Sequence, residues 1–149
     1  MLKKYKMGFD IWGLVVFLII MLPNFIWFAV PAPNDILRAE STTKLIDAIG
    51  SVAQVVMIFA LCAIINTKRN KLCLTKTIVA MISCMVIYYC SWGFYYLGVT
   101  NWIVIMGLTI PPCLAFLFFA IDRKNYISVI PIAIFTVCHM VFGVVNFVI

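Results

Sequence analysis

Charged side chains are scarce in this sequence, and their scarcity indicates the class of protein. Only 11% of the residues are Asp, Glu, Lys or Arg, whereas a typical soluble domain has about 25%. Hydrophobic residues make up 66% of the chain, and the mean hydropathy is +1.16. A soluble domain of 149 residues has too little interior to bury that much apolar surface. We therefore expect lipid to be the solvent for most of the chain, which predicts an integral membrane protein.

Metal-binding and redox motifs are also missing. The sequence has one histidine, His139, and no HExxH or D-x-D pattern lies near it. The six cysteines form no C-x-x-C pair and no zinc-like spacing. We therefore expect no metal, no cofactor and no catalytic residue of these classes. The cysteines are interpreted as small apolar packing residues.

Internal repeats and long polar linkers are absent as well, which indicates a single domain over residues 1–149. The sequence contains instead five apolar runs, each close to the ~20 residues that a helix needs to cross a bilayer. They cover residues 11–30, 44–66, 77–97, 102–121 and 126–149. The predicted fold is an all-α bundle of five transmembrane helices. An odd number of spans disfavours the two equal repeats of large secondary transporters.

The first apolar run has an alternative interpretation, which is a cleaved secretory signal peptide. A signal peptide has an apolar core of about 7–15 residues and ends at a cleavage site with small residues. Residues 11–30 form a longer run, and Trp27, Pro31 and Pro33 stand at its end. We therefore favour a retained first helix.

The basic residues are distributed unequally between the two sides of such a bundle. With five crossings, nine of the 11 Lys and Arg residues fall on one side, within residues 3–6, 67–76 and 122–125. Only Arg38 and Lys44 fall on the other side. Because cations in short loops stay in the cytoplasm, we predict a cytoplasmic N-terminus and an external C-terminus. The basic residues cluster beside apolar spans, which also argues against nucleic acid as a partner.

One polar stretch, residues 31–54, interrupts the apolar pattern on the predicted external side. Its first part is a loop that carries Asp35, Arg38 and Glu40. This loop either contains a short helix at the membrane interface or is irregular, and the sequence favours neither.

The second part of this stretch enters a membrane-spanning helix with a polar face. Lys44, Asp47, Ser51 and Gln54 follow each other at steps of three, four and three, which places them on one side of a helix. A carboxylate and a carboxamide on a membrane-spanning face need a polar partner or a water-filled cavity. The pattern therefore predicts that this face lines a polar pocket.

Polar side chains from other spans fall at a similar predicted depth. Four of the helices carry polar groups in the outer half of the bilayer, whereas the inner half is almost entirely Leu, Ile, Val, Phe and Met. Taken singly, each group is explained by an ordinary hydrogen bond between helices, worth about 0.6–2 kcal/mol. Because they coincide in depth, we predict an outward-facing pocket. Its predicted lining is Asn24, Asp47, Ser51, Gln54, Ser91, Tyr95, His139 and Asn146.

Three classes of function fit this pattern. The preferred one is a small-molecule binding or transport protein, with the pocket as its site and the external loop as its lid. The second is a non-catalytic accessory or immunity-type subunit that packs against a partner membrane protein, or a homo-oligomer. The third is a membrane-embedded enzyme using Asp47 and His139, the one acid–base couple available at that depth. Compact loops and a lysine-rich cytoplasmic side favour the inner membrane of a bacterium.

Overall fold

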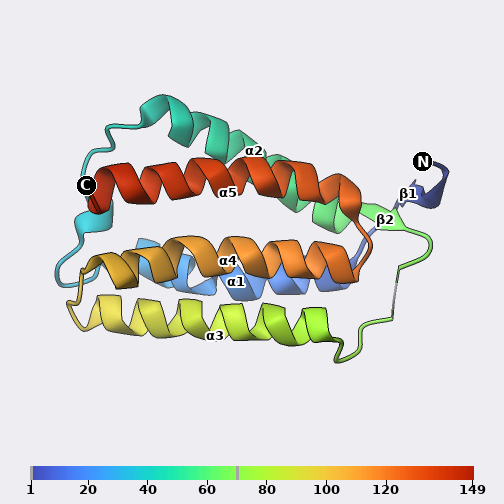
Figure 1. The fold of residues 1–149 in the computed structure, drawn as a ribbon, viewed down its shortest axis with the longest axis horizontal. Helices are drawn as coiled ribbons and strands as arrows, with labels where there is room; N and C mark the ends of the chain where they lie inside the picture. Colours follow the sequence, from blue (N-terminus) through green and yellow to red (C-terminus); the bar gives the residue numbers. More distant parts are fainter. Residues whose placement is uncertain (1, 70) are drawn as a thin grey trace.

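The chain is a bundle of five long helices in a computed structural model that describes residues 2–69 and 71–149 (Figure 1). The helices are α1 (Ile11–Ala29), α2 (Lys44–Ala63), α3 (Lys76–Tyr96), α4 (Trp102–Asp122) and α5 (Tyr126–Phe147). Each is long and apolar enough to cross a membrane, as predicted, so the chain has the architecture of a multi-pass membrane protein. Their bounds differ from the predicted spans by no more than three residues at either end.

A polar residue precedes three of the helices and explains where they begin. Asp10, Thr75 and Asn101 each accept a hydrogen bond from a backbone N–H in the first turn of α1, α3 and α4, respectively. Such N-caps satisfy one of the backbone donors that the first turn of a helix leaves unpaired. The helix starts are therefore set locally, by single side chains.

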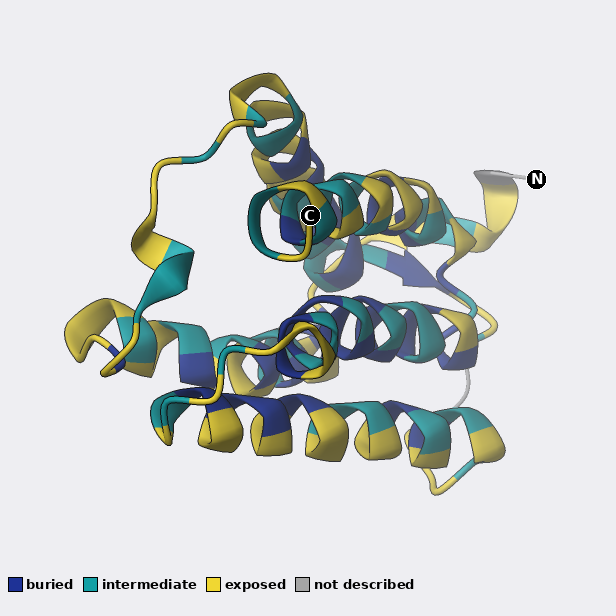
Figure 2. Cartoon of the chain, turned by 60° about the vertical axis from the view of Figure 1, so that its left-hand side comes forward, coloured by how far each residue is buried: buried dark blue, intermediate teal, exposed yellow. Residues whose placement is uncertain are grey.

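The centre of the bundle is α4, which lies between α3 and α5 (Figure 1). In its most apolar stretch 61% of the residues are buried, against 22–28% in the other four helices. In those helices large apolar residues such as Leu45 and Val55 on α2 are exposed, and Figure 2 shows exposed positions in yellow along their outer sides. A helix that is apolar on all sides belongs either inside a large protein or in lipid. The exposed apolar faces are therefore suited to contact with lipid.

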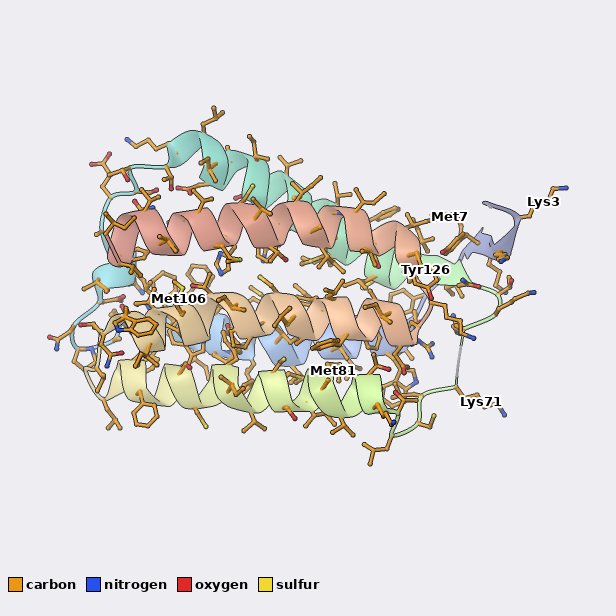
Figure 3. All side chains as sticks on the ribbon, in the orientation of Figure 1. Lys3, Met7, Lys71, Met81, Met106 and Tyr126 are labelled. Atoms are coloured by element: carbon orange, nitrogen blue, oxygen red, sulfur yellow. The ribbon has the colours of Figure 1, made fainter. Side chains whose placement is uncertain are left out.

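One end of the bundle carries a small pair of strands, and we call it the strand end. After a 3-10 turn, η1 (Leu2–Lys4), the strand β1 (Tyr5–Met7) pairs antiparallel with β2 (Ile64–Asn66). The predicted second span extends to residue 66, but α2 ends at Ala63 because the chain becomes extended to pair with β1. Figure 3 shows Lys3 and Lys71 projecting beyond the helices at this end.

A buried ion pair also lies at the strand end. Nη2 of Arg123 donates to Oδ2 of Asp10 at 2.8 Å, and both side chains are no more than 7% exposed. Arg69 lies farther from the same oxygen, at 3.7 Å. The pair ties the start of α1 to the turn between α4 and α5. Nothing in the sequence signals it, because its partners are 113 residues apart.

The opposite end of the bundle is crossed by residues 30–43, which we call the strap. The strap runs from the end of α1 to the start of α2 (Figure 2). It contains a single 3-10 turn, η2 (Ile36–Arg38), and is otherwise irregular. The sequence left open a short helix or an irregular loop, and the strap has one short 3-10 turn within an irregular segment.

The helices α1 and α2 meet near the strand end and separate toward the strap end. A Cβ atom at Gly13 would lie 2.6 Å from the carbonyl oxygen of Leu61, so only glycine permits this approach. Toward the strap end α2 packs on α5 instead, where a Cβ at Gly50 would lie 3.1 Å from that of Cys138. Figures 1 and 2 both show the strap ends of α1 and α2 apart.

Candidate functional site

A cavity of about 350 Å³ occupies the space between the separating helices. All five helices line it, and Leu37 of the strap contributes to its wall. Its polar lining residues are Asn24, Asp47, Ser51, Gln54, Tyr88, Thr109 and His139. The volume lies in the range of about 300–1,000 Å³ that is typical of small-molecule sites.

The wall from α2 presents Asp47, Ser51 and Gln54 to the cavity, as the helical spacing predicts. Oδ1 of Asp47 accepts a hydrogen bond from the hydroxyl of Thr43 at 2.8 Å. The hydroxyl of Ser51 donates to the backbone carbonyl of Asp47. Nε2 of Gln54 lies 3.8 Å from Sδ of Met21 on α1, a weak contact across the cavity. Within residues 2–69 and 71–149, the polar groups of α2 are therefore satisfied only in part.

The wall from α5 presents His139 between two phenylalanine rings. Its ring stacks on Phe135 at a centroid distance of 5.1 Å and on Phe142 at 6.2 Å, with interplanar angles of 15° and 9°. The three residues follow each other at steps of four and three and therefore share one helix face. Within residues 2–69 and 71–149, no hydrogen bond to the imidazole is found. Stacking thus fixes the ring plane, while both nitrogens remain available at the cavity.

The walls from α1 and α3 meet through a hydrogen bond and a group of aromatic rings. Nδ2 of Asn24 donates to the hydroxyl of Tyr88 at 2.6 Å. Below the strap, the rings of Trp27 and Trp92 lie 6.3 Å apart, and Trp92 meets Tyr88 edge to face at 6.4 Å. In such an edge-to-face contact the positive edge of one ring meets the negative face of the other, which is a favoured geometry and stiffens this wall.

The charge of the cavity is unbalanced. Asp47 is the one Asp, Glu, Lys or Arg that lines it in the described part of the chain. No cation of that part lies within ion-pair distance of its carboxyl group. Its nearest basic neighbour along the helix, Lys44, is paired with Glu40 at 2.6 Å, and both are exposed.

Three predicted lining residues lie outside the cavity. The hydroxyl of Ser91 donates to the carbonyl of Ile87 and faces Gly107 of α4. Tyr95 is fully buried, and its hydroxyl points to the strap. The side chain of Asn146 exchanges hydrogen bonds with Thr42 and Thr43 at the other end of the strap.

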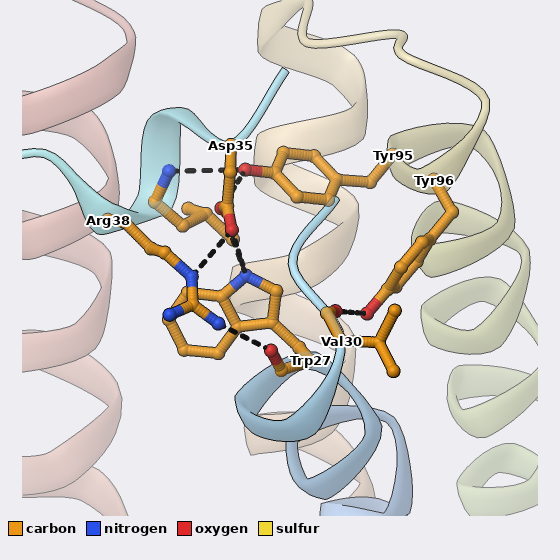
Figure 4. A network of polar contacts seen from close by, with 7 residues as sticks. Trp27, Val30, Asp35, Arg38, Tyr95 and Tyr96 are labelled. Carbon is orange, nitrogen blue, oxygen red and sulfur yellow. Dashed lines mark hydrogen bonds and ion pairs between the residues drawn. The ribbon is translucent and has the colours of Figure 1, made fainter. Parts of the chain in front are cut away.

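The strap is anchored by Asp35, whose carboxyl group is held from three sides (Figure 4). The indole N–H of Trp27 lies 2.9 Å from both oxygens, and the hydroxyl of Tyr95 donates at 2.9 Å. Nε of Arg38 donates at 2.8 Å. The same Arg38 donates to the carbonyl of Trp27 and covers its ring, with Cζ 4.9 Å from the centroid.

These contacts shift the acidity of Asp35. Burial by itself raises the pKa of its carboxyl group. Hydrogen bonds to the ionised form and the charge of Arg38 outweigh burial, so the pKa of Asp35 lies below its ordinary value of 3.8. The anchor is therefore ionised at neutral pH. Glu40, the other acid of the strap, forms only the exposed pair with Lys44.

Several lining residues are missing from the prediction. Tyr88 shares a helix face with Ser91 and Tyr95, so periodicity offered a signal for it. The phenylalanine and tryptophan residues of the lining offered none, since such side chains face lipid and cavity alike in this kind of sequence. The aromatic residues that line the cavity are Trp27, Phe28, Tyr88, Trp92, Phe116, Phe135, Phe142 and Phe147.

Metal chemistry has no evident site in this part of the chain. Across residues 2–69 and 71–149, no group of three or more His, Cys, Asp or Glu side chains could hold an ion. The arrangement instead offers one carboxylate, several uncharged polar groups and many rings around one volume. Such a surface is suited to holding a small organic molecule.

Comparison with known proteins assigns no relative, since no family model, no curated protein and no solved structure matches the chain. The function is therefore inferred from the chemistry of the cavity.

Proposed function

We propose that this protein binds or transports a small molecule, and that the cavity between the separating helices is its site. The observation that carries the proposal is the convergence of Asn24, Asp47, Ser51, Gln54 and His139, from three helices, on one volume of about 350 Å³. Polar groups that served only to join helices would pair with each other. In the described part of the chain, no hydrogen bond joins the side chain of one of these five to the side chain of another, and the hydroxyl of Ser51 reaches only the backbone carbonyl of Asp47.

The polar groups of the lining support a bound molecule or water. The imidazole of His139 and one oxygen of Asp47 receive no hydrogen bond from the described residues, and both residues are half-buried. Their polar atoms are therefore open to water or to a ligand in the cavity, either of which can supply the missing hydrogen bonds.

The direction of access follows from the distribution of cations. The strand end carries the basic clusters, including Lys3 and Lys71, while the strap end carries Arg38 and Lys44. Under the positive-inside rule the strap end faces outward and the cavity belongs to the outer half of the membrane. We infer an outward-facing site in a cell membrane, with the strap as its cover.

An enzyme is the weaker alternative. Asp47 and His139 line the same cavity, but no hydrogen bond joins them in the described part of the chain. A general base is expected to be oriented by a hydrogen-bonding partner, and the imidazole of His139 is held by stacking alone. Binding needs no such alignment.

Thermal unfolding in lipid nanodiscs tests the proposal with three phenyl-rich probes of similar size: tetraphenylphosphonium, tetraphenylborate and triphenylphosphine oxide. We expect at least one probe to raise the melting temperature of the wild-type protein. Ser51→Phe, which places a ring in the cavity, and Gln54→Leu, which removes a polar partner, should reduce that shift.

Cys113→Ala is the control, because Cys113 is buried but does not line the cavity. It should lower the melting temperature of the free protein and leave the shift intact. Equal shifts in all three variants would place binding elsewhere, and no shift with any probe would contradict a small-molecule site.

A further inference from the structure

We propose that the ligand is an amphiphilic organic cation that enters the cavity from the membrane, between α1 and α2. This inference rests on the proposed binding role of the cavity and adds the chemical class of the ligand and its route. Three features support it: the charge of the lining, its aromatic surface and the position of the opening.

The charge of the lining favours a cation. The carboxyl group of Asp47 receives one hydrogen bond, from Thr43, and no described Lys or Arg lies within ion-pair distance of it. The two cations of the strap end have other partners, because Arg38 pairs with Asp35 and Lys44 with Glu40. A carboxylate in a membrane-spanning segment calls for a positive partner, and no Lys or Arg of the described residues supplies one here. A ligand cation completes the pair.

The aromatic surface suits an organic cation better than a hydrated metal ion. Rings attract cations through the negative face of their quadrupole, worth about 0.5–2 kcal/mol per contact. Trp27 already makes this contact with Arg38. Phe28, Tyr88 and Trp92 extend the aromatic wall around the remaining volume. Such a wall also packs against an apolar ligand body, whereas a metal ion would need several oxygen ligands.

The opening of the cavity lies between two helices. Phe28 on α1 lines the cavity and is 65% exposed, and Ser51 on α2 lines it and is also exposed. These helices touch at Gly13 and Leu61 near the strand end and lie apart under the strap. Between the apolar outer faces of the two helices, this opening faces lipid. A ligand that uses it must partition into the bilayer, which an amphiphilic cation does.

The experiment compares tetraphenylphosphonium with tetraphenylborate, which have nearly the same shape and opposite charge. Each is titrated into the full-length protein in nanodiscs of neutral lipid, and binding is followed by quenching of tryptophan fluorescence and by thermal shift. We expect the cation to bind the wild-type protein at least ~10-fold more tightly than the anion or the neutral triphenylphosphine oxide.

Asp47→Asn should weaken binding of the cation by roughly 10-fold and bring the three probes closer together, because only the charge is removed. The matched control is Glu40→Gln, which removes an exposed acid from the same end of the bundle and should change nothing. The melting temperature of the unliganded variants checks that both are folded. The comparison of probes on the wild-type protein does not depend on any variant.

The outcomes separate this inference from the proposed function. If the anion or the neutral probe binds as tightly as the cation, the ligand class is wrong while a small-molecule site is retained. If no probe binds, both are contradicted. If Asp47→Asn and Glu40→Gln weaken binding of the cation equally, the cation responds to surface charge. The assignment of the site to Asp47 is then wrong.

Discussion

Asp35 joins the strap to two helices through a single carboxyl group. Trp27 and Tyr95 donate to it from α1 and α3, and Arg38 donates from within the strap. Hydrogen bonds to an ionised group contribute about 1.5–3 kcal/mol, roughly twice the value of neutral ones. At the residue scale, one acid thus fastens the strap to both α1 and α3.

The first prediction concerns this acid. Asp35→Asn should destabilise the protein by about 1.5–3 kcal/mol at neutral pH, because the carboxamide has no charge and one acceptor oxygen. The folded pKa lies below 3.8, so the ionised carboxyl group stabilises the fold fully above that pH. This contribution is lost as the pH falls through the lower folded pKa. The melting temperatures of wild type and variant should therefore differ at neutral pH, and the difference should begin to shrink once the pH falls below about 3.8.

Glu40→Gln is the matched control, since Glu40 forms only an exposed pair, worth about 0–1 kcal/mol at most. Its melting curve should follow that of the wild-type protein at every pH. A similar loss in both variants would show that Asp35 is not a specific anchor.

Residues of the cavity could be predicted where a helix provided a period. Asp47, Ser51 and Gln54 share a face because of their spacing alone, and all three line the cavity. Tyr95 obeys the same rule on α3, yet its hydroxyl serves the strap. Spacing predicts the face of a residue and not the partner that faces it. The fold-dependent pairing of Asp35 with Tyr95, 60 residues away, has no local signature.

At the scale of the elements, α1 is the helix whose position defines the cavity. It approaches α2 closely at Gly13 and is then bound to α3, where Asn24 meets Tyr88 and the hydroxyl of Tyr96 donates to the carbonyl of Val30. The five helices were predictable from apolar run length, because lipid demands about 20 such residues. The strands were not, since β1 and β2 are three residues each and pair across 57 positions or more.

A second prediction follows from this approach of α1 to α2. Gly13→Ala should destabilise the protein by about 1–3 kcal/mol, because the added Cβ would lie 2.6 Å from a backbone oxygen that cannot rotate away. Gly93→Ala on α3 is the matched control, as no atom lies within 4 Å of its added Cβ. There, alanine should be neutral or stabilise the helix by up to ~1 kcal/mol. Thermal unfolding of both variants in the same detergent provides the measurement, and equal effects would exclude a tight contact at Gly13.

At the scale of the whole molecule, the bundle combines two pairs of helices around α4. Near the strap end α1 is joined to α3, and α2 to α5. The cavity lies between these pairs, which explains why residues from all five helices reach it. The sequence predicted the number of helices and a common depth for their polar groups. It could not predict this pairing, because apolar faces that pack on a helix and those that face lipid have the same composition.

A third prediction concerns the orientation of the molecule in the membrane. Single cysteines at Ala39 on the strap and at Lys71 at the strand end, in a background without the native cysteines, lie at opposite ends of the bundle, and both positions are exposed. An impermeant maleimide added to intact cells should label the first and not the second, because the strand end carries the basic clusters. The reverse pattern would invert the orientation and turn the cavity toward the cytoplasm.

The anchors of the strap also limit how far the two pairs of helices can move apart beneath it. Arg38 is fixed to α1 through the carbonyl of Trp27, and Thr42 is fixed to α5 through Asn146. Four backbone steps separate the Cα atoms of Arg38 and Thr42 and reach at most roughly 14 Å when fully extended, to which the length of the Arg38 side chain is added on the α1 side. The strap is therefore a tether of fixed length, and the gap between the two pairs of helices can widen only until it is taut. A wider separation of the helices requires an anchor to break, so the contacts of Arg38 with Trp27 and Asp35 set how far the two pairs of helices can move apart.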